Sequence, residues 1–131
     1  AELIDTGDLE GVADLFAQGE IVSPQHGARF TGTDEVLALY QMSCRIHDSS
    51  GTPLTKHLTT NVIVELDGSR ATARSYYTVI QGTAKLPLQP IIAGRYHDSF
   101  EKQDDHWHFL RREMFVDLEG DCSEHLLYTL E

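Results

Sequence analysis

Cysteine and basic residues are scarce in this chain of 131 residues, and each shortage excludes a class of protein. The two cysteines, Cys44 and Cys122, are too few and too far apart for a disulfide framework or for the spacing of a zinc site. Ten Lys and Arg stand against 21 Asp and Glu, and the net charge of −11 would repel the phosphates of a nucleic acid. We therefore expect no nucleic-acid partner and, because free thiols suit a reducing compartment, a cytoplasmic location.

Long apolar runs are also missing. None approaches the roughly 18 residues that a membrane span needs, so we expect no membrane association. The opening AELIDTGDLE lacks the basic start and apolar stretch of a signal peptide, and it reads as part of a helix. Length and a hydrophobic share of 40% favour one domain over residues 1–131.

Helical patterns precede strand patterns along the chain. Apolar spacing of three and four residues predicts helices over 8–17 and 34–46. Strand signals fall at 20–23, 28–31, 55–66, 70–82, 91–103 and 107–118, and a short last helix is predicted over 121–130. This order indicates an α+β, cone-shaped fold, in which a curved mixed or antiparallel sheet wraps around the N-terminal helices.

The strand that begins TKHLTTN carries the clearest candidate for chemistry. With a period of two, His57, Thr59 and Asn61 share one face, and the apolar residues of the strand, Leu58, Val62, Val64 and Leu66, lie mainly on the other. Such a strand suits a pocket wall, and histidine can transfer protons near neutral pH. The alternative is a histidine held by a neighbouring threonine or by backbone.

Five segments resemble one known family. They are IDTGDLEGVADLF at 4–16, FTGTDEV at 30–36, TKHLTTNVIVELDGSRATARSY at 55–76, GRYHDSFEKQDDHWHF at 94–109 and the tail FVDLEGDCSEHL at 115–126. They are similar to the SnoaL-like branch of the nuclear transport factor 2-like superfamily, which includes polyketide cyclases, ketosteroid isomerase and scytalone dehydratase. The resemblance implies that His57 is a general base and that the outer sheet face forms a homodimer, with a trimer as the alternative. The sequence has no glycine-rich phosphate loop, metal constellation or nucleophile elbow, so we expect no cofactor.

The resemblance also implies an aspartate partner for His57 on the first helix. By comparison with the dehydratase-like members, that acid would fall at or just before Ala1. Asp5 is the nearest carboxylate within the chain, so it is the candidate that the sequence offers.

Further ligand-contacting residues follow from alternation and from the resemblance. Alternation groups Gly94, Tyr96 and Asp98 on one face, and the phenol of Tyr96 is predicted to hold a substrate oxygen; core packing is the alternative. Gln81 matches a second histidine of the dehydratase and could orient a ligand. Tyr40, Tyr77 and Asn61 complete the predicted binding set, with core packing open for both tyrosines.

The other charged and imidazole side chains receive structural interpretations. His106 and His108 form an H-x-H pair without a third ligand, so we expect no metal site. His26, His47 and His125 read as loop or surface residues. Ion pairs are expected at Arg111, Arg112 and Glu113, and an apolar outer sheet face, with Val79 or Leu110, is expected to be covered by the dimer.

Two functions fit these observations. The first is a small cofactor-independent lyase or isomerase, of dehydratase, cyclase or isomerase type, with His57 as general acid or base on a hydrophobic cyclic or polyketide-like molecule. The second is a non-catalytic binding or structural module resembling the β subunit of ring-hydroxylating dioxygenases. A carboxylate oxygen within hydrogen-bond reach of His57, beside an apolar cavity, would favour the first.

Overall fold

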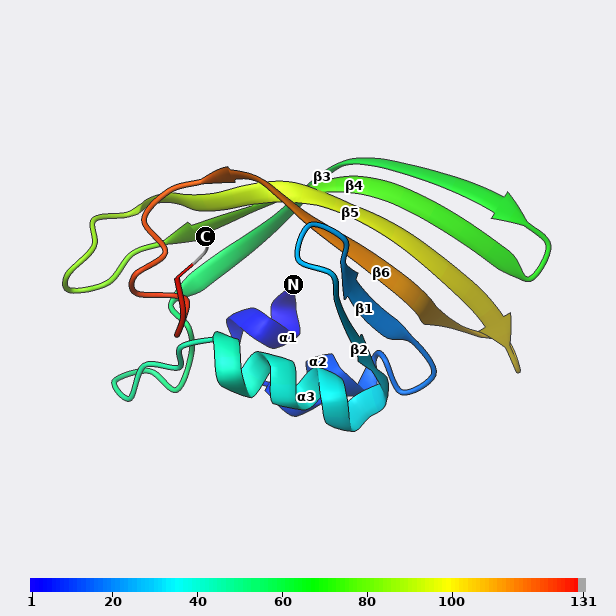
Figure 1. Ribbon diagram of the computed structural model, residues 1–131, viewed down its shortest axis with the longest axis horizontal. Helices are drawn as coiled ribbons and strands as arrows, with labels where there is room; N and C mark the ends of the chain where they lie inside the picture. Colours follow the sequence, from blue (N-terminus) through cyan, green and yellow to red (C-terminus); the bar gives the residue numbers. More distant parts are fainter. Residues whose placement is uncertain (130–131) are drawn as a thin grey trace.

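A computed structural model describes residues 1–129 (Figure 1). Its elements are α1 (Glu2–Asp5), α2 (Leu9–Asp14), β1 (Glu20–Ser23), β2 (Ala28–Thr31), α3 (Gly32–Ser43), β3 (Thr55–Asp67), β4 (Arg70–Gln81), β5 (Gln89–Gln103) and β6 (His106–Glu119). No helix within the described residues has both the length and the apolar character needed to cross a membrane.

The six strands form one sheet in the order β2-β1-β6-β5-β4-β3. β1 runs parallel to β6, and the other neighbours are antiparallel, so the sheet is mixed. Figure 1 shows the sheet arching over α1, α2 and α3, which all lie on its concave side. The predicted α+β fold with a curved sheet around N-terminal helices is confirmed.

The predicted helix at 121–130 is wrong for the residues that the structure describes. Residues 121–129 form turns and one isolated bridge between Cys44 and Leu126, and residue 130 lies outside the described range. The backbone of this segment pairs with the end of α3 instead: Arg45 N donates to His125 O at 2.8 Å, and Leu127 N donates to Ser43 O at 2.9 Å. Long-range pairing has replaced the local bonds of a helix.

A bulge in β3 overturns the predicted division of its two faces. The register shifts between Thr60 and Ile63, where Asn61 has a φ of 54°. Before the bulge His57 pairs with Val79, and after it Val64 pairs with Ala73, on the same buried face of β4. The extra residue therefore turns Val64 and Leu66 toward the face that carries His57.

The core lies between the concave face of the sheet and the helices. Phe16, in the turn that follows α2, stacks on Phe109 of β6, with ring centroids 4.6 Å apart. Val79 is only 2% exposed and also faces the helices, so its predicted position on the outer face is wrong. Outer-face positions carry ion pairs such as Arg95 with Asp117, at 2.8 Å. Homodimer formation through that face stays a prediction.

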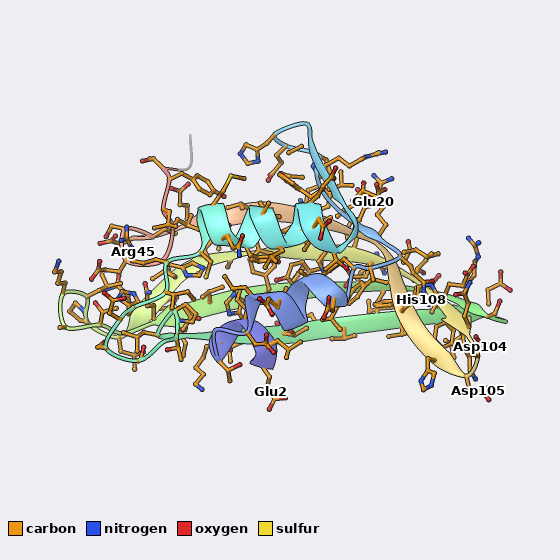
Figure 2. All side chains as sticks on the ribbon, turned by 90° about the horizontal axis from the view of Figure 1, so that it is seen from below. Glu2, Glu20, Arg45, Asp104, Asp105 and His108 are labelled. Carbon is orange, nitrogen blue, oxygen red and sulfur yellow. The ribbon has the colours of Figure 1, made fainter. Side chains whose placement is uncertain are left out.

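The sheet is longer than the helices that it covers. Figure 2 shows the turn between β5 and β6, marked by Asp104 and Asp105, extending beyond α2 and α3, with His108 at the same end. The H-x-H pair therefore lies at the turn end of β6. Among residues 1–129, no three His, Cys, Asp or Glu side chains gather into a possible metal site.

Candidate active site

A cavity of about 320 Å³ lies between the concave sheet face and the helices. Its walls are mostly apolar and aromatic, and they include Ile4, Val12, Phe16, Leu39, Val79, Ile92, Met114 and Val116. Polar side chains from α3, four strands of the sheet and the C-terminal segment also line it; they include Tyr40, His57, Tyr77, Tyr96, Arg112 and His125. An apolar chamber with a few convergent polar groups is typical of a small-molecule site.

Asp5 and His57 form a hydrogen-bonded pair at the wall of this cavity. The Nδ1 atom of His57 lies 2.6 Å from Asp5 Oδ1, and the backbone N–H of His57 donates to Asp5 Oδ2 at 2.9 Å. Thr55 Oγ1 donates to Asp5 Oδ1 at 2.9 Å. Three donors from the start of β3 thus fix a carboxylate from the end of α1.

A glycine turn after α1 brings the carboxylate to this position. Gly7 has a φ of 82°, and a Cβ there would collide with the backbone carbonyl of Gly51. Only glycine adopts this backbone and tolerates this approach without strain. The close packing of the turn on the 47–53 loop holds α1 beside the first residues of β3.

The environment sets the protonation state of the pair. Burial lowers the pKa of His57 below its ordinary value, and the neighbouring Asp5 carboxylate opposes this only in part. Burial raises the pKa of Asp5, but the hydrogen bonds from His57 and Thr55 outweigh it, so the net pKa shift is downward. At neutral pH the pair is therefore a carboxylate and a neutral imidazole. Because Nδ1–H donates to Asp5, the lone pair is on Nε2.

Arg112 supplies positive charge to the same cavity. Its Nε and Nη2 donate to Asp98 Oδ1 and Oδ2 at 2.8 and 3.0 Å. The guanidinium lies 3.7 Å from the centroid of the Tyr96 ring. These two bonds hold Arg112 rigidly and do not involve Nη1. Nη1 can therefore donate a hydrogen bond to a ligand.

Tyr77 and Tyr96 stack against each other, with ring centroids 4.5 Å apart. The hydroxyl of Tyr77 donates to Phe115 O at 2.8 Å, so its proton is committed to the sheet. Gly94 makes this bond possible, because a Cβ there would lie 2.7 Å from the Tyr77 hydroxyl oxygen. Burial raises the pKa of Tyr96, and Arg112 opposes the shift, so this phenol is a neutral donor at physiological pH.

The family follows from a comparison with known families. The model of the SnoaL-like domain matches residues 1–113, most of the chain. The chain belongs to the SnoaL-like family. A search of the curated proteins found no match to this SnoaL-like chain.

Solved structures agree with this assignment. A protein of unknown function from Mycobacterium tuberculosis is 28% identical, with a TM-score of 0.71 over 88% of this chain and 64% of that protein. A candidate scytalone dehydratase from Novosphingobium aromaticivorans is 26% identical, with a TM-score of 0.70 over 99% of this chain and 80% of that one. A nuclear transport factor 2-like protein with a cystatin-like fold from the same organism is 22% identical, with a TM-score of 0.72, covering 94% and 77%. The SnoaL-like chain thus spans less than two thirds of the M. tuberculosis protein.

The structure gathers most of the predicted site residues and separates two of them. His57, Tyr40, Tyr77 and Tyr96 line the cavity, and Asp5 supports His57 from behind. Gln81 lies outside the lining: its Nε2 donates to Pro53 O and Glu124 O at 2.9 and 3.0 Å. Asn61 is exposed at the bulge of β3 and also lies outside the lining. The roles of all these residues in binding or catalysis stay predictions.

Arg112 and His125 are polar cavity residues that were not predicted. Arg112 was expected only as an ion-pair residue, and its alternation with Met114 and Val116 along β6 was the available signal of its face. His125 was expected in a loop or at the surface; it lies in a turn, but it is only 6% exposed and lines the cavity, so a surface position is wrong. No local pattern marks His125, because long-range pairing with α3 buries it.

Proposed function

We propose that this SnoaL-like protein is a cofactor-independent lyase or isomerase that removes a proton next to a carbonyl group of a hydrophobic cyclic molecule. The observation that carries the proposal is the Asp5–His57 pair at the wall of an apolar cavity. The carboxylate fixes the tautomer that leaves a lone pair on Nε2, which is the arrangement of a general base.

The proposed reaction uses three side chains. Arg112 and Tyr96 donate hydrogen bonds to the carbonyl oxygen of the substrate. His57 Nε2 takes a proton from the adjacent carbon, and the C–H electron pair moves to the carbonyl oxygen, which becomes an enolate oxygen. The imidazolium of His57 then returns the proton, either to another carbon of the enolate in an isomerisation or to a departing oxygen in an elimination. Fixed donors in a cavity of low polarity stabilise the negative charge that develops.

The substrate class follows from the walls of the cavity. The stacked Tyr77 and Tyr96 rings and the surrounding aliphatic side chains favour a flat, largely apolar molecule. A volume of about 320 Å³ lies at the lower end of the range for ligand pockets and suits a molecule of one or two fused rings. The likeness to a candidate scytalone dehydratase supports elimination of water as the reaction type.

The proposal can be tested with 3-hydroxy-1-tetralone, a two-ring β-hydroxy ketone. Loss of water from this ketone gives fluorescent 1-naphthol, so product formation can be followed directly. We expect the wild-type protein to accelerate the reaction and His57→Gln to lose about 10²- to 10⁴-fold of the rate, the usual contribution of a general base. His106→Gln is the matched control, because His106 is exposed and is the first residue of β6, next to the β5–β6 turn. A His57→Gln variant as fast as His106→Gln would refute the proposal.

A further inference from the structure

His125 brings a second imidazole to the cavity from the C-terminal segment. The side chain lines the cavity, and its ring centroid lies 6.0 Å from that of His57, at an interplanar angle of 67°. The family model ends at residue 113, so this histidine lies beyond the part of the chain that the family description covers. It has no part in the reaction proposed above.

The bonds that hold this segment come from its backbone rather than from the ring of His125. Glu124 O accepts a hydrogen bond from Gln81 Nε2 at 3.0 Å and pairs with His47 Nε2 at 2.9 Å. His125 O accepts from Arg45 N at 2.8 Å. The backbone on both sides of the His125 ring is thereby fixed, and the ring is free for another role.

The two nitrogens of His125 differ in their surroundings. Nδ1 is enclosed and has no hydrogen-bond partner within residues 1–129. Burial lowers the pKa of His125 to about 4, so the ring is neutral at physiological pH and carries one N–H. An orphaned buried N–H is rarer in proteins than an under-satisfied acceptor, which assigns the proton to Nε2. With Nδ1 enclosed, Nε2–H is the donor left for the cavity.

We propose that His125 Nε2–H binds the β-hydroxyl oxygen of a cyclic β-hydroxy ketone whose neighbouring α-proton is taken by His57. This inference rests on the proposed function and narrows its substrate class. Each histidine would approach its atom to about 3 Å, and two rings 6.0 Å apart can therefore contact neighbouring carbons of one ligand ring. Arg112 and Tyr96 would donate hydrogen bonds to the carbonyl oxygen at the other end of the ligand.

The elimination balances with these groups alone. His57 Nε2 takes the α-proton, and the C–H electron pair forms the double bond between the α- and β-carbons by way of the enolate. The bond between the β-carbon and the hydroxyl oxygen breaks, and that oxygen takes the proton back from the His57 imidazolium to leave as water. His125 keeps its own proton and holds the departing oxygen by a hydrogen bond.

The test compares two ketones that differ only in the hydroxyl group. Binding of 3-hydroxy-1-tetralone and of 1-tetralone is measured by calorimetry in His57→Gln, which removes the proposed base and so limits turnover. We expect about tenfold tighter binding of the hydroxy ketone, the worth of one hydrogen bond. Adding His125→Phe or the smaller His125→Leu should remove this preference, and His125→Gln, which keeps an N–H donor, should retain part of it.

The outcomes separate this inference from the proposed function. Three results would overturn the role of His125. They are equal binding of both ketones while His125 is intact, a preference for the hydroxy ketone that survives both apolar replacements, and no binding of either ketone. Turnover of 3-hydroxy-1-tetralone in the protein with His57 intact tests the base independently. A preference that depends on His125, without any turnover, would uphold the hydroxyl contact and refute the lyase.

Discussion

Within residues 1–129, His57 is held through one of its two ring nitrogens. Nδ1 hydrogen-bonds to Asp5 Oδ1 at 2.6 Å, and Nε2 makes no hydrogen bond to those residues. The acid and the base come from α1 and β3, more than fifty residues apart in sequence. Their meeting depends on single residues such as Gly7, where a side chain would collide with Gly51.

Replacing Asp5 with asparagine should impair the base more than the fold. The two carboxylate oxygens accept hydrogen bonds from three donors: Thr55 Oγ1, His57 Nδ1 and the His57 backbone N–H. The amide of asparagine has only one acceptor oxygen, so at least one of these donors loses its partner. We expect a loss of about 10²-fold or more in the rate of 1-naphthol formation and roughly 1–3 kcal/mol of stability.

The pH profile of Asp5→Asn distinguishes positioning from simple damage. Asp5 raises the pKa of His57 against the effect of burial, so its removal should lower that pKa further. The acid limb of the rate profile should then move to lower pH than in the wild type, where it already lies below the ordinary histidine pKa of about 6.5. An unchanged limb would contradict the proposed coupling.

Gly94→Ala should destabilise the sheet at the tyrosine stack. The new Cβ would lie 2.7 Å from the Tyr77 hydroxyl oxygen and would also collide with Phe115 O, which accepts that hydroxyl's hydrogen bond. We expect a loss of about 1–3 kcal/mol in the free energy of unfolding, measured by urea denaturation. Gly82→Ala is the matched control, since its Cβ would meet Leu88 at an ordinary 3.4 Å. Equal stability of the two variants would contradict this reading of Gly94.

At the scale of elements, the sequence predicted the strands better than it predicted the site. The runs at 20–23 and 28–31 coincide with β1 and β2, and the four long strands begin and end close to their predicted bounds. Strand alternation and turn residues are local signals, so they can be read from one segment at a time. Asn61 shows where prediction from strand alternation fails. The one-residue bulge there exchanges the two faces of β3, and no local sequence pattern marks the bulge.

The conformation of the C-terminal segment, residues 121–129, could not be predicted from local sequence patterns either. Its conformation depends on partners at Ser43, Arg45, His47 and Gln81, which belong to other parts of the chain. Gln81 was expected to contact a ligand; in the structure its amide donates to Pro53 O and to Glu124 O, next to His125. Asp5 was chosen only because it was the nearest carboxylate within the chain. No sequence pattern predicts its contact with His57, because that contact depends on the packing of α1 on β3.

Gln81→Leu should loosen this segment more than the sheet. The change leaves Pro53 O and Glu124 O without the donors at 2.9 and 3.0 Å. We expect a loss of roughly 1–3 kcal/mol and faster amide hydrogen exchange at Arg45 and Leu127, whose N–H groups bond across the segment. Exchange in the middle of β5 should be much less affected. Unchanged exchange at Arg45 and Leu127 would contradict the anchoring role.

At the scale of the whole molecule, the buried histidines make stability depend on pH. Burial is the main cause that lowers the pKa of His125 to about 4; His57 and His47 lower it further, and Asp5 opposes them. An unfolded chain binds this proton at about pH 6.5, so between pH 6.5 and about 4 it binds more protons than the folded chain. Stability should therefore fall as the pH falls through this window.

Urea unfolding at pH 7 and at pH 4.5 measures this effect. We expect His125 to contribute a loss on the order of 3 kcal/mol over its full window, with a further contribution of the same sign from His57, whose pKa is also lowered. Asp5 has its pKa lowered from 3.8, so its contribution is lost only below that window. His125→Phe should lose less stability between the two pH values than the wild type. An equal loss in both proteins would contradict the assignment to His125.

The measurement that tests the central claim most directly is deuterium exchange at the α-carbon of 1-tetralone in deuterium oxide, followed by proton NMR. This ketone has no hydroxyl group to lose, so the exchange reports proton removal alone and is independent of His125. We predict that the protein catalyses the exchange, that His57→Gln loses it by about 10²-fold or more, and that His106→Gln keeps it. No catalysis by the wild-type protein, or equal exchange in His57→Gln and His106→Gln, would show that the Asp5–His57 pair is not a general base.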